Sequence, residues 1–195
     1  EELITIPCLS REFRCRLLSA CKFDWSEVSP AIFGALFQSV MTAEERSNLG
    51  GYATSEENIM KVVDSLFLGQ LRAEFDEALR LPMSKRTQKL ETLRDRLPKM
   101  RFLDPACGCG NFLVVSYREL RRLELDILIE LNSLGALHDE YSKTSVVDVD
   151  QFYGIEIRSY SARIARTAMW MTDHTANSEL SFALGINFRR VPLQK

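Results

Sequence analysis

An acid followed by a glycine-rich turn, at residues 104–110, constrains the fold of this chain more than any other stretch. The apolar Phe102 and Leu103 come before Asp104, and an apolar helical pattern begins at Asn111. A strand, a tight turn and a helix in this order form a ligand pocket at the carboxyl end of a strand in an open parallel α/β sheet. Gly108 and Gly110 permit positive φ angles and a close approach of the backbone to a ligand. We therefore expect a nucleotide-type pocket, rimmed by the N-terminal amides of the helix.

Asp104 determines which ligand suits this turn. A carboxylate repels a pyrophosphate but attracts a cation or an ammonium group. The dinucleotide fingerprint G-x-G-x-x-G is not met, because Leu113 stands in place of the third glycine. The Gly-Lys-Ser/Thr of a phosphate-binding P-loop does not occur in the chain. A ligand with an amino-acid end therefore fits the turn better than a dinucleotide does.

A second acid follows the same pattern at residues 152–157, which we predict to be the second strand, carrying Glu156 near its end. A helix predicted from residue 111 to about 134 separates the two strands, so they form a βαβ unit and run parallel. A carboxylate at Glu156 can accept two strong hydrogen bonds from a ribose diol, while Asp104 faces an ammonium or sulfonium group. This pair matches S-adenosyl-L-methionine. The alternative is that both acids merely cap the ends of buried strands.

The rest of the chain reads mostly as helices. Ser10 is predicted to be the N-cap of a helix that runs to about Cys21. Thr54 and Glu57 are predicted to form a capping box at the start of a helix over 55–79. Charged residues 81–99, with a proline near each end, predict an exposed helix acting as a linker. Further helices are predicted at 31–41, after a Ser-Pro pair, at about 42–49, and at about 161–176. We expect a helical region at 1–98 and the cofactor-binding half of an α/β domain at 99–195.

Composition narrows the class of protein. The net charge of −2 argues against a surface on this chain that grips DNA. Five irregularly spaced cysteines suit a reducing compartment, so a cytoplasmic location is expected, and the Cys107-x-Cys109 pair alone is too weak a pattern for a metal site. No apolar run is long enough to span a membrane. Because the chain does not open on methionine, we expect it to be a fragment of a longer protein.

These motifs together resemble one enzyme family. The stretch from Asp104 to Leu113 (DPACGCGNFL) looks like motif I of the DNA methyltransferases that methylate the amino group of adenine, and Tyr153–Ile157 (YGIEI) looks like their motif II. Residues 33–41, 49–59 and 165–174 are similar to segments of the Type IIG restriction-modification proteins, in which nuclease and methyltransferase share one polypeptide. The resemblance covers residues 24–194. It implies a partial Rossmann-like fold that binds S-adenosyl-L-methionine, preceded by a helical region.

The resemblance also implies roles for particular residues. The segment at Thr54 would close over the methionine moiety, the glycine turn would cradle the cofactor, and Glu156 would hold the ribose. The implied cofactor-binding residues are Thr54, Asp104, Ala106, Cys107, Gly108, Gly110, Asn111, Phe112, Glu156 and Ile157. The family has Tyr directly before this Thr, whereas Ala53 stands here, so an aromatic wall of the pocket is missing or displaced. The alternative role of Thr54 is that of a helix N-cap alone.

The catalytic motif of the family, Asn-Pro-Pro followed by an aromatic residue, occurs nowhere in the chain. In the family it orients the adenine amine of a base flipped out of the duplex. We therefore assign no catalytic residue and expect the chain to be inactive alone, as the cofactor-binding part of a DNA adenine-N6 methyltransferase. A fragment of an RNA or protein-glutamine methyltransferase, or a non-catalytic scaffold remnant, remains the alternative. DNA is then the substrate of the full-length protein, and exposed sheet edges predict self-association.

Overall fold

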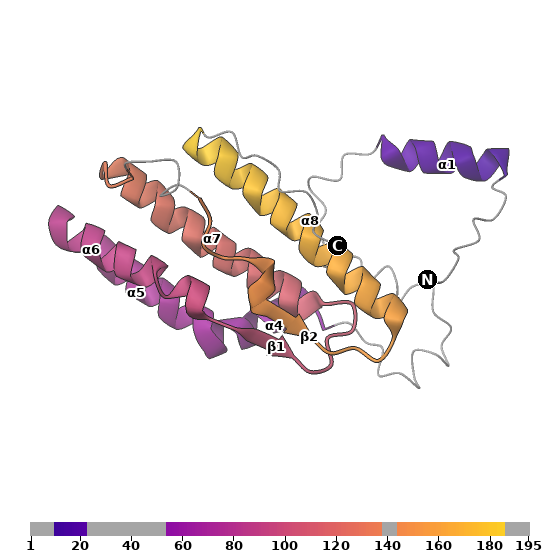
Figure 1. The fold of residues 1–195 in the computed structure, drawn as a ribbon, viewed down its shortest axis with the longest axis horizontal. Coiled ribbons are helices and arrows are strands. Elements are labelled where there is room, and N and C mark those ends of the chain that lie inside the picture. The colour runs from indigo at the N-terminus through magenta and orange to yellow at the C-terminus, as the bar shows by residue number, and fades with distance from the viewer. Residues whose placement is uncertain (1–9, 23–53, 138–143, 186–195) are drawn as a thin grey trace.

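A computed structural model of the chain describes residues 10–22, 54–137 and 144–185. Two short strands lie against a set of helices (Figure 1). The elements in chain order are α1 (Arg11–Cys21), α4 (Glu56–Val63), the π-helical η1 (Asp64–Leu68), α5 (Gly69–Leu79), α6 (Met83–Arg94), the 3-10 turn η2 (Leu97–Lys99), β1 (Phe102–Asp104), α7 (Asn111–Ser133), the 3-10 turn η3 (Val149–Gln151), β2 (Phe152–Gly154) and α8 (Ser159–Leu184). The helices predicted for 31–41 and 42–49 lie outside the described residues.

The two strands form a parallel sheet, as the sequence predicts. Phe102 pairs with Phe152, Leu103 with Tyr153, and Asp104 with Gly154. One face of the sheet packs on the helices, where the rings of Phe102 and Phe152 stack at 4.6 Å and Tyr117 of α7 meets Phe152 edge-on. Leu103 and Tyr153 on the other face are 62% and 51% exposed. The described part of the chain is therefore helix-rich, with a small parallel sheet, and it covers one face of that sheet.

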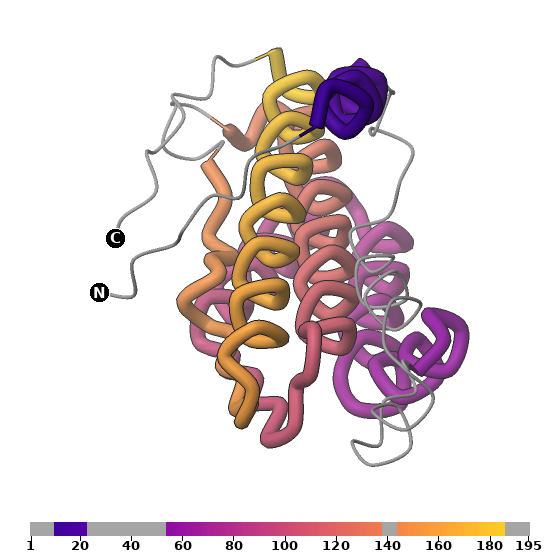
Figure 2. Tube along the Cα trace, turned by 90° about the vertical axis from the view of Figure 1, so that its right-hand side faces the viewer, coloured from indigo at the N-terminus to yellow at the C-terminus, as the bar shows by residue number. Residues whose placement is uncertain are grey.

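Helix α7 lies at the centre of the molecule (Figure 2). It packs against α8 on one flank and against α4 and α6 on the other, while both strands contact it. Five apolar residues that recur at helical spacing along the sequence of α7 are all buried: Leu113, Leu120, Leu123, Ile127 and Leu131. The apolar spacing of this helix therefore predicts its buried face correctly. Helix α1 buries none of its side chains and lies apart from the other helices (Figure 1).

The N-cap of helix α4 lies one residue later than predicted. Ser55, not Thr54, is the N-cap, because its Oγ accepts a hydrogen bond from the Asn58 amide at 3.4 Å. The predicted capping box of Thr54 and Glu57 is therefore wrong, although the helix does extend to Leu79. It is interrupted by the π-helical segment η1. A methyl group at Gly69 would lie 2.8 Å from the Asp64 carbonyl oxygen, so the residue that directly follows this segment has no room for a side chain.

The segment predicted as an exposed linker forms α6 and η2, and it belongs to the core. Leu90, Leu93 and Leu97 are almost completely buried against α5 and α7. Their spacing of three and four residues places them on one face of a helix. The prediction of a helix is confirmed, but the prediction that it is an exposed linker is wrong, because a narrow apolar stripe is enough to bury one face of a charged helix.

Two further boundaries differ from expectation. Strand β2 ends at Gly154, so Glu156 follows the strand by two residues, and α8 extends to Leu184 instead of about Ala176. Arg121 lies outside the apolar stripe that the sequence of α7 shows, yet it is only 5% exposed. Its guanidinium donates to Asp173 at 3.0 Å and to Asn177 at 2.7 Å, both on α8. This buried polar contact joins the two long helices.

Candidate functional site

The glycine turn and the segment after β2 are tied together by backbone hydrogen bonds. The Ile155 amide donates to the Asp104 carbonyl at 2.9 Å, and the Cys107 amide donates to the Ile155 carbonyl at 3.0 Å. The turn closes on itself through the Gly110 amide, which donates to the Cys107 carbonyl at 2.7 Å. The residue directly before Glu156 is thus bonded to both ends of the Asp104–Cys107 segment. The structure brings together the two motifs that the sequence places 50 residues apart.

Two glycines of the turn adopt left-handed backbone conformations, with φ +55° at Gly108 and +85° at Gly110. L-residues with a side chain rarely take these angles. Gly110 is the N-cap of α7, and its carbonyl accepts the Val114 amide at 2.8 Å. A methyl group at Gly108 would have no atom within 4 Å, so that side of the turn is open. The turn therefore has the free space beside its backbone that a bound ligand requires.

Asp104 and Glu156 are each oriented by the same local contact. An Asp104 carboxylate oxygen accepts the Ala106 amide at 3.0 Å, and a Glu156 carboxylate oxygen accepts the Arg158 amide at 2.9 Å. Both side chains are half-buried. A carboxylate has roughly four acceptor positions, so one backbone hydrogen bond orients the group and leaves acceptor capacity for a ligand. Each strand end thus carries an ordered carboxylate.

The charges of Asp104 and Glu156 both affect the pKa of the Cys107 thiol. Burial raises the pKa of Cys107 above its usual value, and the charges of Asp104 and Glu156 raise it further. Burial likewise raises the pKa of Cys109, a hydrogen bond with Ser161 opposes that shift, and Glu156 adds to it. The Asp104 and Glu156 carboxylates therefore lie close to the turn, and the Arg158 cation opposes their effect on Cys109. Two carboxylates at one turn suit a cationic ligand better than an anion.

Replacing Asp104 with Asn tests this electrostatic arrangement. The amide keeps an oxygen that can accept the Ala106 amide but removes the charge, so the pKa of the Cys107 thiol should fall. We expect Cys107 to react faster with iodoacetamide at pH 8 in Asp104→Asn than in the unsubstituted chain, because the thiolate is the reactive form. Peptide mass spectrometry measures the rate, with the exposed Cys15 and Cys21 as internal references. The exposed Asp76, changed to Asn, is the control; equal Cys107 rates in both variants would contradict the arrangement.

The remaining predicted residues lie around this turn in different ways. Phe112, in the first turn of α7, packs against a cluster of Ile59, Val63, Leu68 and Val115, which brings α4 alongside α7. Thr54 is exposed just before α4 and is not its cap, so the alternative role as N-cap does not apply. Ile157 is 97% exposed, so its side chain is not buried by any of the described elements. Ala106 is exposed, and Asn111 is half-buried at the start of α7.

Sequence reasoning missed two contacts of the turn. Gly154 of β2 lies against Cys107, since a methyl group there would be 2.6 Å from the Cys107 sulfur. Ala165 of α8 lies against Gly110, since a methyl group on Gly110 would be 2.8 Å from the Ala165 Cβ. A glycine inside a strand is a signal of close backbone approach and could have indicated the first contact. The second had no local signal in the sequence.

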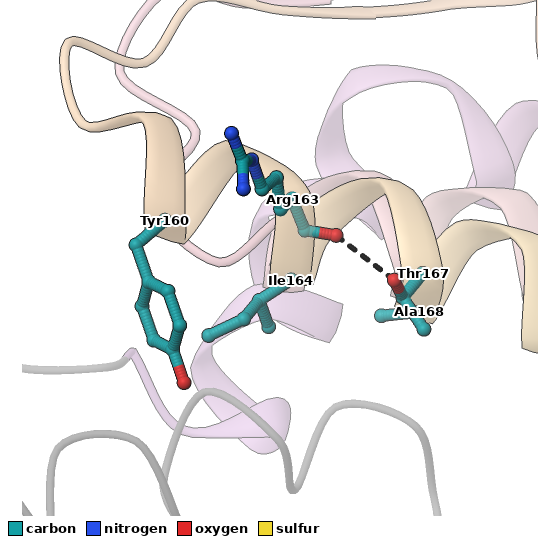
Figure 3. Close-up of a pocket in the computed structure, with 5 residues that line it drawn as sticks. All are labelled: Tyr160, Arg163, Ile164, Thr167 and Ala168. Atoms are coloured by element: carbon teal, nitrogen blue, oxygen red, sulfur yellow. Dashed lines mark hydrogen bonds between the residues drawn. The ribbon is translucent and has the colours of Figure 1, made fainter. Parts of the chain in front are cut away.

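A pocket of about 250 Å³ lies along one face of the N-terminal half of α8 (Figure 3). It is lined by Tyr160, Arg163, Ile164, Thr167 and Ala168, and the Thr167 hydroxyl donates to the Arg163 carbonyl at 3.0 Å. None of the predicted site residues lines it. Its described walls come from one helix and carry none of the carboxylate chemistry of the turn.

Within the described residues there is no cluster of three or more His, Cys, Asp or Glu side chains that could hold a metal ion. No described helix is both long and apolar enough to cross a membrane. Cys15, Cys21, Cys107 and Cys109 are free thiols. The chemistry of the site therefore rests on two carboxylates, backbone amides and open space beside a glycine turn.

Comparison with known proteins places the chain among methyltransferases. Residues 81–195 match the family described as the DNA-methyltransferase domain of MmeI. The chain is 40% identical over 184 residues to DNA methyltransferase A of Bacillus subtilis (strain 168), covering 92% of this chain and 20% of that protein. It is 24% identical over 167 residues to a putative type II restriction enzyme and methyltransferase of Methanocaldococcus jannaschii, covering 74% of this chain and 14% of that protein.

A solved structure agrees with these relatives. The Type IIL restriction-modification enzyme MmeI, in complex with DNA, superimposes with a TM-score of 0.83 and 45% sequence identity, over 95% of this chain and 24% of that one. The chain thus spans about a fifth of the B. subtilis relative and a quarter of the MmeI chain. The resemblance to DNA methyltransferases of restriction-modification systems is confirmed. The chain belongs to the family of the MmeI DNA-methyltransferase domain.

Proposed function

We propose that this chain is the S-adenosyl-L-methionine-binding part of a DNA adenine-N6 methyltransferase. One observation carries the proposal: in a chain of this family, an open glycine turn is bonded to the residue before Glu156, and the Asp104 and Glu156 carboxylates both act on the thiol of Cys107. Two carboxylates beside exposed turn backbone suit a ligand with a cationic amino-acid end and a ribose. They do not suit a pyrophosphate.

The residues present fit this cofactor. Asp104 would bind the cationic methionine end, Glu156 would accept hydrogen bonds from the ribose hydroxyls, and the open side of Gly108 would admit the ligand. The exposed Ile157 offers an apolar surface beside Glu156. The backbone of Ala106, Cys107 and Gly110, together with Asn111, Phe112 and Thr54, completes the proposed set. The cofactor, when bound, supplies an activated methyl group.

We further propose that the fold is part of a Rossmann-like domain. Purely parallel sheets are almost always covered on both faces, whereas Leu103 and Tyr153 on the described strands, and Ile155 directly after β2, are exposed. Additional strands and a second helical layer would complete the domain. The proposed regions remain 1–98 and 99–195, although α6 and α7, which lie on either side of that boundary, share one core.

The exposed apolar face of the sheet should make the isolated chain self-associate. Sedimentation velocity at increasing concentration tests this prediction, and a constant sedimentation coefficient would contradict it.

DNA is the proposed substrate of the full-length protein, and the cytoplasm its proposed location. Both sequence relatives are described as a DNA or restriction-system methyltransferase, and the MmeI structure contains DNA. These names favour DNA over RNA or a protein glutamine as the methyl acceptor. No catalytic residue is proposed in this chain, which we expect to be inactive alone.

Methyl transfer by the full-length protein tests the proposal. With tritiated S-adenosyl-L-methionine, we expect label in N6-methyladenine of duplex DNA and none in RNA or protein. The same protein carrying Glu156→Ala should transfer little label, and the exposed Glu57→Ala is the matched control. Label in cytosine, RNA or protein would contradict the proposed substrate. No transfer by any form would support the scaffold alternative.

A further inference from the structure

The glycine turn is held from two sides by small residues that lie outside motif I. On the side of α8, a methyl group on Gly110 would lie 2.8 Å from the Ala165 Cβ and 3.1 Å from its Cα. On the side of β2, a methyl group on Gly154 would lie 2.6 Å from the Cys107 sulfur and 3.0 Å from the Leu113 Cδ1. These distances are shorter than ordinary van der Waals contact, so neither interface has room for one more carbon.

We propose that Ala165 and Gly154 are positioning residues for the cofactor turn. Their small size sets where the turn lies relative to Glu156, and through that position it sets the affinity for the methyl donor. This inference rests on the proposed function, because it names residues that control the same site. Neither Ala165 nor Gly154 is proposed to touch the cofactor.

The turn cannot yield to a larger neighbour without moving the site. Cys107 is bonded to Ile155, Ile155 to Asp104, and Gly110 back to Cys107, so a shift of any one is passed to the others. Ile155 directly precedes Glu156, and Asp104 carries the other carboxylate. A binding arrangement needs its groups within about 0.5 Å of the productive geometry, and tightly packed contacts transmit strain. A larger side chain at residue 165 would push on Gly110 and would therefore displace the Asp104 and Glu156 carboxylates from their ordered positions.

Ala168 supplies a matched control. It is one turn further along α8 and 3% exposed, against 6% for Ala165, but it packs into the main core with residues of α7. The three atoms nearest to a methyl group on Gly110 all belong to Ala165. Valine at either position overpacks a buried site, so both variants should lose thermal stability. Only the variant at residue 165 acts directly on the turn.

The test compares the chains carrying Ala165→Val and Ala168→Val by calorimetric titration with S-adenosyl-L-methionine. We expect Ala165→Val to weaken binding at least about tenfold, a change of about 1.4 kcal/mol, and Ala168→Val to leave it within about twofold. Ala165→Gly, which removes the contact without adding volume, should bind like the unsubstituted chain. If Ala165→Val does not fold, Ala165→Ser replaces it. Equal losses from both valine variants would overturn the inference.

The second contact is tested by a double-mutant cycle. Gly154→Ala should weaken binding, and it should weaken it less when Cys107→Ala has removed the sulfur that the new methyl group meets. Equal effects in both backgrounds would show that Gly154 does not act through Cys107.

Amide hydrogen exchange separates this inference from the proposed function. Without cofactor, the Cys107 and Gly110 amides should exchange faster in Ala165→Val than in Ala168→Val, because their hydrogen bonds are strained only in the former. Failure of the unsubstituted chain to bind S-adenosyl-L-methionine would contradict the proposed function alone. Unchanged exchange in Ala165→Val would contradict the positioning role alone.

Discussion

Replacing Arg121 with Ala lowers the free energy of unfolding by about 3–5 kcal/mol, the expected cost of removing one member of a buried ion pair. Arg121 is 5% exposed and lies 3.0 Å from Asp173 and 3.5 Å from Glu124, which is 1% exposed. Without the guanidinium, the Glu124 carboxylate stays buried with its hydrogen bonds to Ser145 and Val146 but without a nearby cation on α7. The contact between α7 and α8 weakens as a result. Urea unfolding followed by circular dichroism measures the loss.

The pH dependence of that loss gives a second check. Burial raises the pKa of Glu124 in the folded chain, while Ser145, the Val146 amide and Arg121 oppose the shift. A folded-state pKa above the unfolded value means that the folded chain holds this proton more tightly, so the contribution of Glu124 to stability is fully present below the unfolded-state pKa and is lost as pH rises through the folded-state pKa. Removing Arg121 raises this pKa further, so the variant should lose more stability at pH 7 than at pH 5. Lys61→Ala, at an exposed pair with Glu57, is the control and should cost about 1 kcal/mol or less at both pH values. A loss from Arg121→Ala no larger than that of the control would contradict the buried-pair account.

Replacing Leu90 with Ala should cost about 2–5 kcal/mol, the range for truncating a fully buried leucine. Leu90 is completely buried, and it packs in the core that α6 shares with α7. Leu66 in η1 is 74% exposed and provides the matched control, with an expected change within about 0.5 kcal/mol. The midpoint of urea unfolding distinguishes the two variants. A Leu90→Ala midpoint equal to that of Leu66→Ala would show that α6 is an exposed connector, as its charges alone predict.

The α6 segment shows why part of the fold escaped prediction. Leu90, Leu93 and Leu97 have helical spacing in the sequence, but charged residues and two prolines surround them and favour the interpretation as a linker. A narrow stripe becomes buried only when a partner helix covers it, and that partner is long-range information. Arg121 illustrates the same limit, since its partner Asp173 lies 52 residues away. Local periodicity was sufficient for α7, whose apolar stripe is wide and continuous.

The candidate site was more predictable than the core around it. Asp104, the glycine turn and Glu156 follow from residue chemistry and from the rule that parallel strands end at one edge of a sheet. The structure places them together through Ile155, although β2 ends at Gly154, earlier than the predicted strand at 152–157. The contacts of Gly154 and Ala165 could not be predicted in full, because they depend on how closely α8 and β2 approach the turn. The predicted N-cap of α4 was wrong by one residue because threonine and serine, at positions 54 and 55, are both favourable N-cap residues.

Binding of S-adenosyl-L-methionine to this chain tests the central claim most directly. Calorimetric titration should give one site for the unsubstituted chain, and Glu156→Ala should bind at least about tenfold more weakly, because hydrogen bonds to a charged group contribute about 1.5–3 kcal/mol each. Asp104→Asn should also weaken binding, while the exposed Glu57→Ala should not. One binding site that is lost in Glu156→Ala and kept in Glu57→Ala is the predicted result. No heat from the unsubstituted chain, or equal binding by Glu156→Ala, would contradict the assignment of this turn as a cofactor site.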